Sequence, residues 1–372
     1  MTTTIQPVAT TFGRALSARV DAGLSEEILS RAYRRLHSKA VVVAAWYAGS
    51  YLAMLFASNW ITGPLACISF ALATVAVGFN IQHDANHNAF FRTRGSRRLS
   101  TANRIAGFSL NAIGGSAKRW IDGHVIQHHA APNVVGRDHD IELAPFARLA
   151  PAQRRRPWHA FQHLYLWGVY AFTSGAIIVS DISNTIQESF RGDRHGRAPG
   201  LREYGALASS KGAFLLFMIV IPMLFHPWWV VTLGALIVLA VSGFLLGVVF
   251  QLAHVVEEAD FCEAMNRGTG RWHEWQVRSS IGFCHGEGIA SRLLTWYAGG
   301  LNFQTEHHLF PSLPHTVYPH ISLIVTQTCE EFGIERRVQP TLRGAVRSHY
   351  RHVRRLGRPD LLEVPIDERD AA

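Results

Sequence analysis

Eight histidines of this chain fall into four groups whose spacing is typical of metal ligands. The groups are His83 with His87, His124 with His128 and His129, His254 by itself, and His307 with His308. Imidazole is the commonest metal ligand in proteins, and a zinc ion is saturated by a single tetrahedral set of ligands. The number of histidines therefore predicts two metal ions, both held almost entirely by imidazole.

The spacing within the groups indicates how the histidines would face the two ions. His83 and His87 are four residues apart, and residues at that spacing lie on one face of an α-helix, one turn above each other. The second group repeats this spacing and adds His129, which is rotated by about 100° from its neighbour and can reach a second ion. The adjacent His307 and His308 diverge in the same way.

Each group taken alone also has an ordinary structural explanation. An isolated H-x-x-x-H pair is often structural, adjacent histidines occur in solvated loops, and a single histidine at a helix end is more often a core or capping residue. The four groups together favour a metal centre, because such clusters normally report one. The remaining histidines are interpreted as structural, and the candidates for an additional role among them are His139, His163, His285 and His315.

The type of ligand narrows the choice of metal. Imidazole suits zinc, copper, iron and nickel, but zinc would need fewer ligands. Soluble di-iron bundles use glutamates and E-x-x-H pairs, which are missing here. The sequence therefore predicts two non-haem iron ions in a nitrogen-rich site, with O2 as the co-substrate.

Long apolar blocks separate the histidine groups. They cover residues 39–58, 60–80, 213–233 and 235–253, and each is about 20 residues long, enough to cross about 30 Å of hydrocarbon. Buried core helices of a soluble protein are the alternative, but the blocks are too long and too many. We expect an all-α integral membrane protein with four transmembrane helices in two hairpins, turned at Asn59 and around Gly234.

The basic residues set the expected orientation. The formal net charge is +9, and the basic clusters fall between the apolar blocks, as the positive-inside rule requires of cytosolic segments. Every histidine group then lies at the cytosolic end of a span or in a cytosolic segment. The positive charge is thus attributed to membrane topology, and no nucleic-acid partner is expected.

Four cysteines without a C-x-x-C pair argue against a disulfide framework and a cysteine zinc site. The first 37 residues do not resemble a cleavable signal peptide.

The three longer histidine motifs resemble the histidine boxes of the membrane fatty-acid desaturases, H-x(3–4)-H, H-x(2–3)-H-H and (H/Q)-x(2–3)-H-H. They read His83-Asp-Ala-Asn-His87, His124-Val-Ile-Gln-His128-His129 and Gln304-Thr-Glu-His307-His308. Similarity covers roughly residues 40–335. The glutamine that opens the third box resembles the front-end subgroup, which acts between an existing double bond and the carboxyl end. In the second box, Val125 stands where relatives often have Asn. This difference affects the expected substrate and leaves the expected metal ligands unchanged.

The resemblance implies four membrane helices under a cytosolic helical cap that holds the dimetal site. It divides the chain into a cytosolic segment 1–37, a desaturase domain 38–335 and a cytosolic tail 336–372. The eight histidines would bind the irons, and Gln304 would act beside them as a weak ligand or through water. The reaction would be O2-dependent desaturation of a fatty-acyl chain, carried by CoA, a carrier protein or a phospholipid and held in a narrow apolar channel.

The same resemblance bears on the electron source. Many front-end members carry a fused haem domain with an H-P-G-G motif, but no histidine precedes His37 here. We therefore expect a separate donor such as a ferredoxin. A basic surface around Arg92, Arg94, Arg97, Arg98 and Arg154 to Arg156 would attract it, although the same arginines could instead only fix topology and contact lipid phosphates.

Three other functions compete with desaturation. A hydroxylase or ketolase of the same superfamily shares the metal site and differs in the fate of the substrate radical. An intramembrane zinc protease would carry the motif H-E-x-x-H, and H-D-A-N-H has the same spacing. However, Asp84 replaces the general-base glutamate, and the other two histidine boxes would have no role in such a protease. A metal transporter would place ionisable residues inside its spans, which have almost none.

Two further expectations concern the surroundings of the site. Ligating histidines usually donate their second N–H to a carboxylate or carbonyl, so at least two partners are expected among five nearby acids: Asp84, Asp138, Asp140, Glu257 and Glu306. The charged end of the chain, residues 354–372, is expected to be loosely ordered.

Overall fold

The computed structural model describes residues 11–93, 95–192, 197–262 and 271–359, and these residues are largely helical. The longest helices are α2 (Glu26–Leu55), α3 (Thr62–Val77), α9 (Thr173–Arg191), α10 (Leu201–Leu215), α11 (Trp228–His254) and α16 (Leu342–Leu356). Shorter α-helices are α1 (Phe12–Gly23), α4 (His83–Asn86), α5 (Arg97–Gly107), α6 (Ser109–Ala112), α7 (Ala117–Trp120), α8 (Gln162–Tyr170), α12 (Trp272–Ser279), α13 (Ile289–Tyr297), α14 (Gln304–Leu309) and α15 (Tyr318–Glu331).

The remaining elements are short. Three π-helical segments are η1 (Gly78–Gln82), η2 (Ile121–His128) and η5 (Leu216–Val220), and four 3₁₀ turns are η3 (His139–Ile141), η4 (Pro157–Phe161), η6 (Pro222–Leu224) and η7 (His315–Val317). Strands β1 (Gly282–Phe283) and β2 (Val338–Gln339) form a small parallel pair, with Gly282 opposite Val338.

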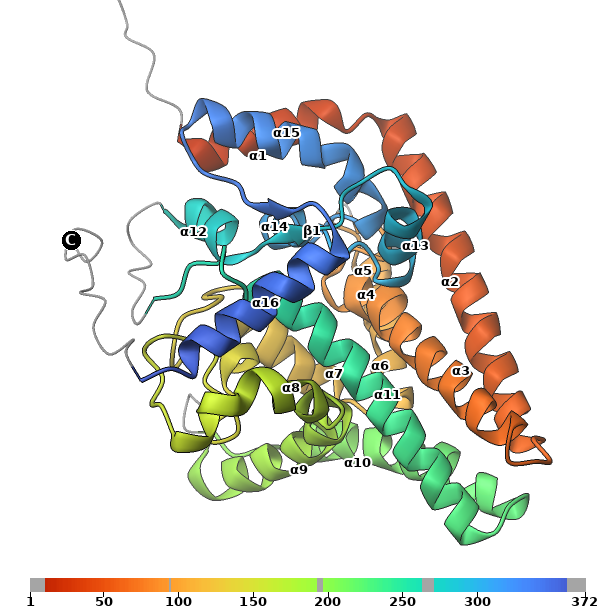
Figure 1. Ribbon diagram of the computed structural model, residues 1–372. Coiled ribbons are helices and arrows are strands. Elements are labelled where there is room, and N and C mark those ends of the chain that lie inside the picture. Colours follow the sequence, from red (N-terminus) through yellow and green to blue (C-terminus); the bar gives the residue numbers. More distant parts are fainter. Residues whose placement is uncertain (1–10, 94, 193–196, 263–270, 360–372) are drawn as a thin grey trace, which may run out of the picture.

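Four helical runs of the described chain are long and apolar enough to cross a membrane: Glu26–Phe56, Thr62–Asn86, Leu201–Leu224 and Trp228–His254. This confirms the expected number of membrane-length helices. Ser25 caps the first of them by accepting a hydrogen bond from the backbone N–H of Ile28, a standard way to satisfy an orphan donor at a helix start. α3 packs between α2 and α11 (Figure 1), and these three helices form the apolar part of the molecule.

The boundaries of the third and fourth spans differ from the expected ones. The chain turns at residues 225–227, not around Gly234, which lies inside α11. Pro227 occupies the N-cap of α11 in an extended conformation, since proline fixes φ and lacks the N–H that a continuing helix would need. A single glycine inside a helix costs only about 1 kcal/mol, so Gly234 does not interrupt it. The third membrane-length run also begins earlier than expected, at Leu201 and not at residue 213.

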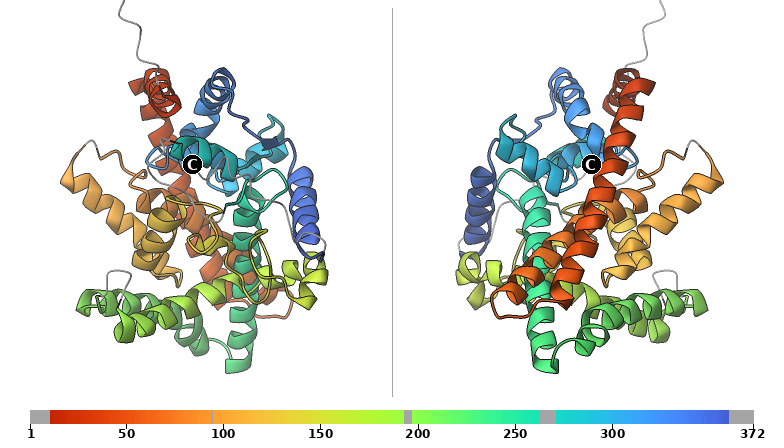
Figure 2. Two further views of the ribbon diagram at one scale, coloured as in Figure 1. Left: turned by 90° about the vertical axis from the view of Figure 1, so that its left-hand side faces the viewer. Right: turned by 90° about the vertical axis from the view of Figure 1, so that its right-hand side faces the viewer.

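The third run does not lie along α11 over its length. α10 packs mainly on α6 and α9, and the main contacts of this run with α11 come from η5 and η6. Figures 1 and 2 show α9 and α10 running crosswise to α11. α8 and α9 are themselves part of a bent pair, Pro157–Tyr170 and Thr173–Arg191, with an angle of 81° between its halves.

Both ends of the described chain pack onto the helices above the apolar part. α1 lies against α15, and Leu16 and Val20 are buried with Ile321 and Val325 in one hydrophobic cluster. α16 packs on α8 and α11 and buries Val353. The expected loose order is therefore wrong for residues 354–356, which end α16, while residues 360–372 lie outside the described residues.

Candidate metal centre

Four separate elements deliver the histidines to one place. The first two come from α4 and its C-cap, the next three from the end of η2, His254 ends α11, and the last two lie on α14. All eight are buried. The loop before α14 reaches this place through Gly299, whose φ is +59° and whose added Cβ would collide with the carbonyl oxygen of Phe79.

The first two boxes lie at π-helical turns, which the α-helical spacing did not predict. The backbone N–H of His83 bonds to the carbonyl of Gly78, and that of His129 bonds to the carbonyl of His124 at 3.1 Å. Both are i to i+5 bonds, and such π-bulges are frequent at functional sites.

The ring nitrogens form two groups in which every pair of ligand atoms lies within 4.8 Å. The first group is His83, His87, His124 and His307, and the second is His128, His254 and His308. His307 and His308 thus diverge as expected. His124 and His128 lie on one side of η2 as expected, with their rings stacked at 5.1 Å. They belong to different groups of imidazoles, and both also approach Asp140.

His129 lies between the two groups. Its ring stacks on that of His308 at a centroid distance of 4.4 Å and lies 4.7 Å from the rings of His87 and His307. Neither of its nitrogens has a hydrogen-bond partner in the protein. This position allows His129 to face either group.

The buried nitrogens fit metal ions. The Nε2 atoms of His83, His87, His124, His128 and His307 are buried without a hydrogen-bond partner. Each buried unpaired polar atom costs about 1–3 kcal/mol, and native proteins contain few of them. Burial lowers the pKa of His129, His307 and His308 well below the usual value, and their imidazole neighbours add to the effect. These three rings are therefore held in the neutral form that binds metal.

Gln304 adjoins the second group. Its side-chain nitrogen lies 2.9 Å from Nε2 of His254 and 3.3 Å from Nε2 of His308. Its amide oxygen is buried without a partner. The second group has one histidine fewer than the first, so a glutamine at this position completes a set of four side chains around it.

Comparison with known proteins agrees with this geometry. Residues 58–340 match the sequence model of the fatty acid desaturases. The chain belongs to the fatty acid desaturase family. As a desaturase it is an oxidoreductase that introduces a double bond into a fatty-acyl chain, which confirms the function expected from the histidine boxes.

Similar desaturases come from several kinds of organism. The chain is 32% identical to an sn-1 linoleoyl-lipid 6-desaturase of Arthrospira platensis, over 93% of this chain and 92% of the relative. It is 30% identical to the protein of the same name from Synechocystis sp., over 93% and 96%. It is 31% identical to an acyl-lipid (8-3)-desaturase of Physcomitrium patens, over 85% of this chain and 65% of the relative.

The hydrogen-bond partners of the desaturase's histidines agree in part with the expectation. Asp138 is a partner as expected, with its Oδ1 2.9 Å from Nδ1 of His128. Asp140 lies 3.4 Å from the same nitrogen and 3.6 Å from Nδ1 of His124. Burial alone would lower the pKa of His128, but the charges of Asp138 and Asp140 outweigh it and raise that pKa to about 9. The same carboxylates would stabilise a cation at this position.

The other three acids, Asp84, Glu257 and Glu306, do not make such a hydrogen bond to a histidine of the two groups. Asp84 lies 3.8 Å from Nδ1 of His83 and bonds more closely to His315, whose ring contacts Lys39 on its other side. Glu257 is exposed. Glu306 is fully buried and pairs with Arg336, so among the five acids only Asp138 makes a hydrogen bond of normal length to a histidine of the two groups.

Three partners on distant parts of the chain were not predicted. Gln276 Oε1 lies 2.8 Å from Nδ1 of His308, the carbonyl of Ser279 lies 3.0 Å from Nδ1 of His254, and the hydroxyl of Tyr318 lies 3.2 Å from Nδ1 of His307. The sequence carries no local signal for these contacts. They fix the ring orientation as second partners of ligating histidines do.

The pair Glu306–Arg336 gives a prediction for stability. The Arg336 guanidinium lies 2.5 Å from the Glu306 carboxylate, and the side chains are 8% and 0% exposed. Arg336→Met should lower the free energy of unfolding by about 3–5 kcal/mol, because it leaves a buried charge without compensation. Thermal unfolding in detergent measures this. The double variant Glu306→Gln with Arg336→Met should recover much of the loss, and equal loss in both would contradict the assignment.

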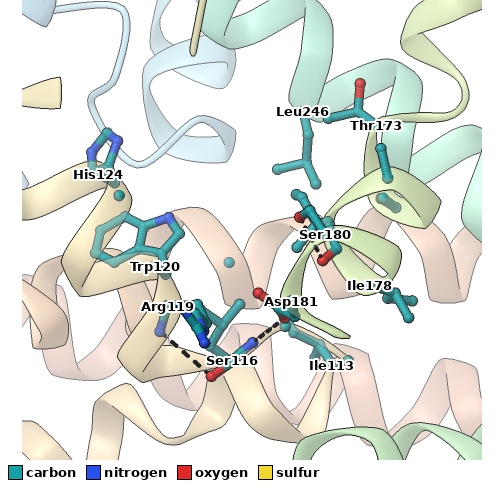
Figure 3. A pocket seen from close by; sticks show the side chains of 18 of the residues that line it. Ile113, Ser116, Arg119, Trp120, His124, Thr173, Ile178, Ser180, Asp181 and Leu246 are labelled. Atoms are coloured by element: carbon teal, nitrogen blue, oxygen red, sulfur yellow. Dashed lines mark hydrogen bonds between the residues drawn. The ribbon is translucent and has the colours of Figure 1, made fainter. Parts of the chain in front are cut away.

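A cavity of about 1440 Å³ begins beside the first histidine group. Trp120 stacks on His124 at a centroid distance of 4.4 Å, and both line the cavity (Figure 3). Much of the apolar lining comes from α3, η5 and α11, including Phe70, Met218 and Leu246, and α9 adds Ile177 and Ile178. The polar part includes Arg119 and Asp181. A long apolar chain with one polar end matches this lining.

Proposed function

We propose that this desaturase acts on lipid-linked acyl chains at two iron ions, using O2 and two electrons from a separate protein. The observation that carries this proposal is the pair of buried imidazole groups with unpartnered Nε2 atoms at the wall of a long, mainly apolar cavity. The relatives named as acyl-lipid or linoleoyl-lipid desaturases support the lipid-linked substrate.

Different side chains of the protein would have different roles at this metal centre. The first histidine group would hold one iron, and the second group with Gln304 would hold the other, with His129 between them. Bound iron would supply the activation of O2 and the removal of hydrogen from an unactivated methylene. Asp138, Gln276 and Tyr318 orient the rings, and Trp120 with the apolar lining keeps the acyl chain beside them.

The cavity also suggests how the substrate lies. Its apolar lining lies among α3, η5 and α11, while Arg119 and Asn184 line it near α7 and α9. Burial of apolar surface is the main driving force for binding such a chain. The methyl end would therefore enter between the apolar helices, and the ester end would remain at α7 and α9, with the reacting carbons beside Trp120 and His124.

Expression in a host without polyunsaturated lipids tests the reaction. Cells would be fed linoleic acid, and new double bonds would be located by mass spectrometry in phospholipids, glycolipids, acyl-CoA and acyl-carrier fractions. We expect a new double bond on the carboxyl side of the existing ones, appearing first in the glycerolipids. A hydroxylated or ketonic product would favour the hydroxylase or ketolase alternative, and early labelling of acyl-CoA would contradict the lipid-linked substrate.

We also propose that the metal centre faces the cytosol and that the spans form two hairpins, as the positive-inside rule favours. The segments 1–37, 38–335 and 336–372 remain the proposed division, with one structural addition. α1 and α16 pack onto the central segment, so truncation at residue 37 or 335 should weaken the fold as well as shorten the chain.

The docking surface for the electron donor is proposed on α16. Its exposed arginines are Arg343, Arg347, Arg351, Arg354, Arg355 and Arg358, and none forms an ion pair with a described residue. Arg154 is exposed beside the end of this helix, where Arg155 donates to the carbonyl of Gly357. The surface around Arg92 and Arg94 is less suitable, because Arg92 pairs with Glu26 and Arg94 lies outside the described residues.

Charge reversal on the α16 surface should weaken docking of an acidic donor. His349 Nδ1 lies 2.6 Å from the carbonyl of Val255, directly after His254, so α16 lies close to the second histidine group. Arg347→Glu with Arg351→Glu should raise the KM for ferredoxin about tenfold, since complementary charge mainly speeds association. Steady-state turnover with ferredoxin and its reductase at rising salt measures this.

The matched control is Arg34→Glu, an exposed arginine on α2 that bonds to Ser30. It should leave the KM unchanged. Turnover of the unaltered enzyme should fall with salt as exposed charges become screened. If neither salt nor charge reversal changes turnover, the arginines serve topology alone.

A further inference from the structure

Helix α9 exposes an apolar stripe, while the residues that it buries are the polar Asp181 and Thr185. The exposed stripe starts at Phe172, just before the helix, and continues through Val179, Ile182, Ile186 and Phe190, which repeat at near-helical intervals. Phe172 is 75% exposed and Phe190 is 85% exposed. A water-facing helix shows the reverse pattern, with its apolar stripe turned toward the core.

The buried face of α9 is tied to the rest of the protein by polar contacts. Asp181 accepts from the backbone N–H of Ser116 at 2.9 Å and from the Lys211 ammonium at 2.6 Å. Arg119 donates to Thr185 at 2.8 Å and to both oxygens of Glu188. Asp181 and Thr185 are only 5% and 2% exposed. These contacts fix the rotation of α9, so the apolar stripe cannot turn inward.

A lipid leaflet fits this stripe better than water does. Large exposed apolar patches mark interaction surfaces, and this one continues into an apolar run of membrane length, Leu201–Leu224, that follows α9 in the chain. Phe161 and Leu164 of the preceding bent half are exposed as well. Arg191 at the end of α9 is exposed and can reach lipid phosphates. Helices of this kind lie in the membrane surface with their apolar face about 5–10 Å deep.

We propose that α9 lies in the plane of the membrane surface, with its stripe from Phe172 to Phe190 in lipid, so that the cavity opens to the bilayer. Thr173, Ile178, Ser180 and Asp181 of the same helix line the cavity opposite Trp120 and His124 (Figure 3). Phe172 and Ile177 both line the cavity and are exposed, so the cavity reaches the surface beside α9. An acyl chain can then slide in from the leaflet without crossing water. The orientation rests on the membrane location proposed above, but its test needs no turnover.

Spin labels on single cysteines test the position of α9 in the full-length protein in phosphatidylcholine and phosphatidylglycerol vesicles. Labels would be placed at Val179, Ile182, Ile186 and Phe190, with Leu236 on α11 as lipid reference and Arg347 on α16 as water reference. Collision rates with O2 and with a water-soluble nickel chelate would be measured. Native Cys67, Cys284 and Cys329 are buried, and Cys262→Ser removes the remaining thiol.

The stripe labels should resemble Leu236, with an O2-to-nickel collision ratio at least about fivefold above that of Arg347, since O2 concentrates in hydrocarbon and the chelate in water. Labels that behave like Arg347 would overturn the proposal, as would labels shielded from both probes, which would indicate a second copy or another protein. Depth is measured at Val179 and Phe190, which lie about 16 Å apart along the helix. Equal depth supports the in-plane position, and a depth difference above about 10 Å would mean that α8 and α9 form a broken span.

Discussion

His308→Ala should reduce desaturation by at least about 100-fold, because loss of a residue that only orients a ligand already costs about 10–100-fold and His308 is expected to be a ligand itself. The second imidazole group holds only His128, His254 and His308, so the substitution leaves two imidazoles and Gln304. Bound iron, measured by mass spectrometry of the metal in purified protein, should fall from two ions per chain to one or none.

The matched control is His320→Ala, an exposed histidine whose Nε2 lies 3.2 Å from the carbonyl of Gly23. It should retain full activity and both irons. Two further outcomes are decisive for the centre as a whole. Full activity of His308→Ala, or one zinc and no iron in the unaltered protein, would refute the two-iron assignment.

Asp138→Asn should lower activity and metal affinity by about 10–100-fold with little change in fold. Asp138 Oδ1 lies 2.9 Å from Nδ1 of His128, while Oδ2 accepts from the backbone N–H of Asn133 at 2.7 Å. Asparagine preserves the shape but removes the charge that supports a ligating imidazole, and partners of this kind usually cost that much when lost.

Glu257→Gln is the control for Asp138→Asn. Glu257 is three residues from His254 in the sequence, but its side chain is exposed, so this variant should behave like the unaltered enzyme. A chelator titration separates positioning from folding, because Asp138→Asn should release iron at lower chelator concentrations and regain activity when excess iron is supplied. Equal chelator sensitivity in both variants would contradict the positioning role.

Several features of this desaturase could be predicted from the sequence because they depend on residues close together in the chain. The histidine boxes, the glutamine at the start of the third box and four apolar runs are local patterns, and they predicted the desaturase family, the histidines of the candidate metal centre and the membrane-length helices. Asp138 could also be predicted as a partner of a ligand histidine, since it lies only ten residues after His128 in the sequence. The turn at Pro227 was missed because apolar residues flank it on both sides and a hydropathy pattern does not register backbone geometry.

Tertiary structure decided which histidines belong to which of the two groups. The π-helical turn at His124 and His129 places i to i+5 hydrogen bonds where an α-helix was assumed. The rings of His124 and His128 still stack at 5.1 Å, and it is the histidines arriving from α4, α11 and α14 that divide them between the two groups. Gln276 and Tyr318 support His308 and His307 from separate helices, and only packing could bring them there. The exposed stripe of α9 likewise needed the burial of Asp181 and Thr185 to be known, because the sequence of an amphipathic helix does not say which face is turned inward.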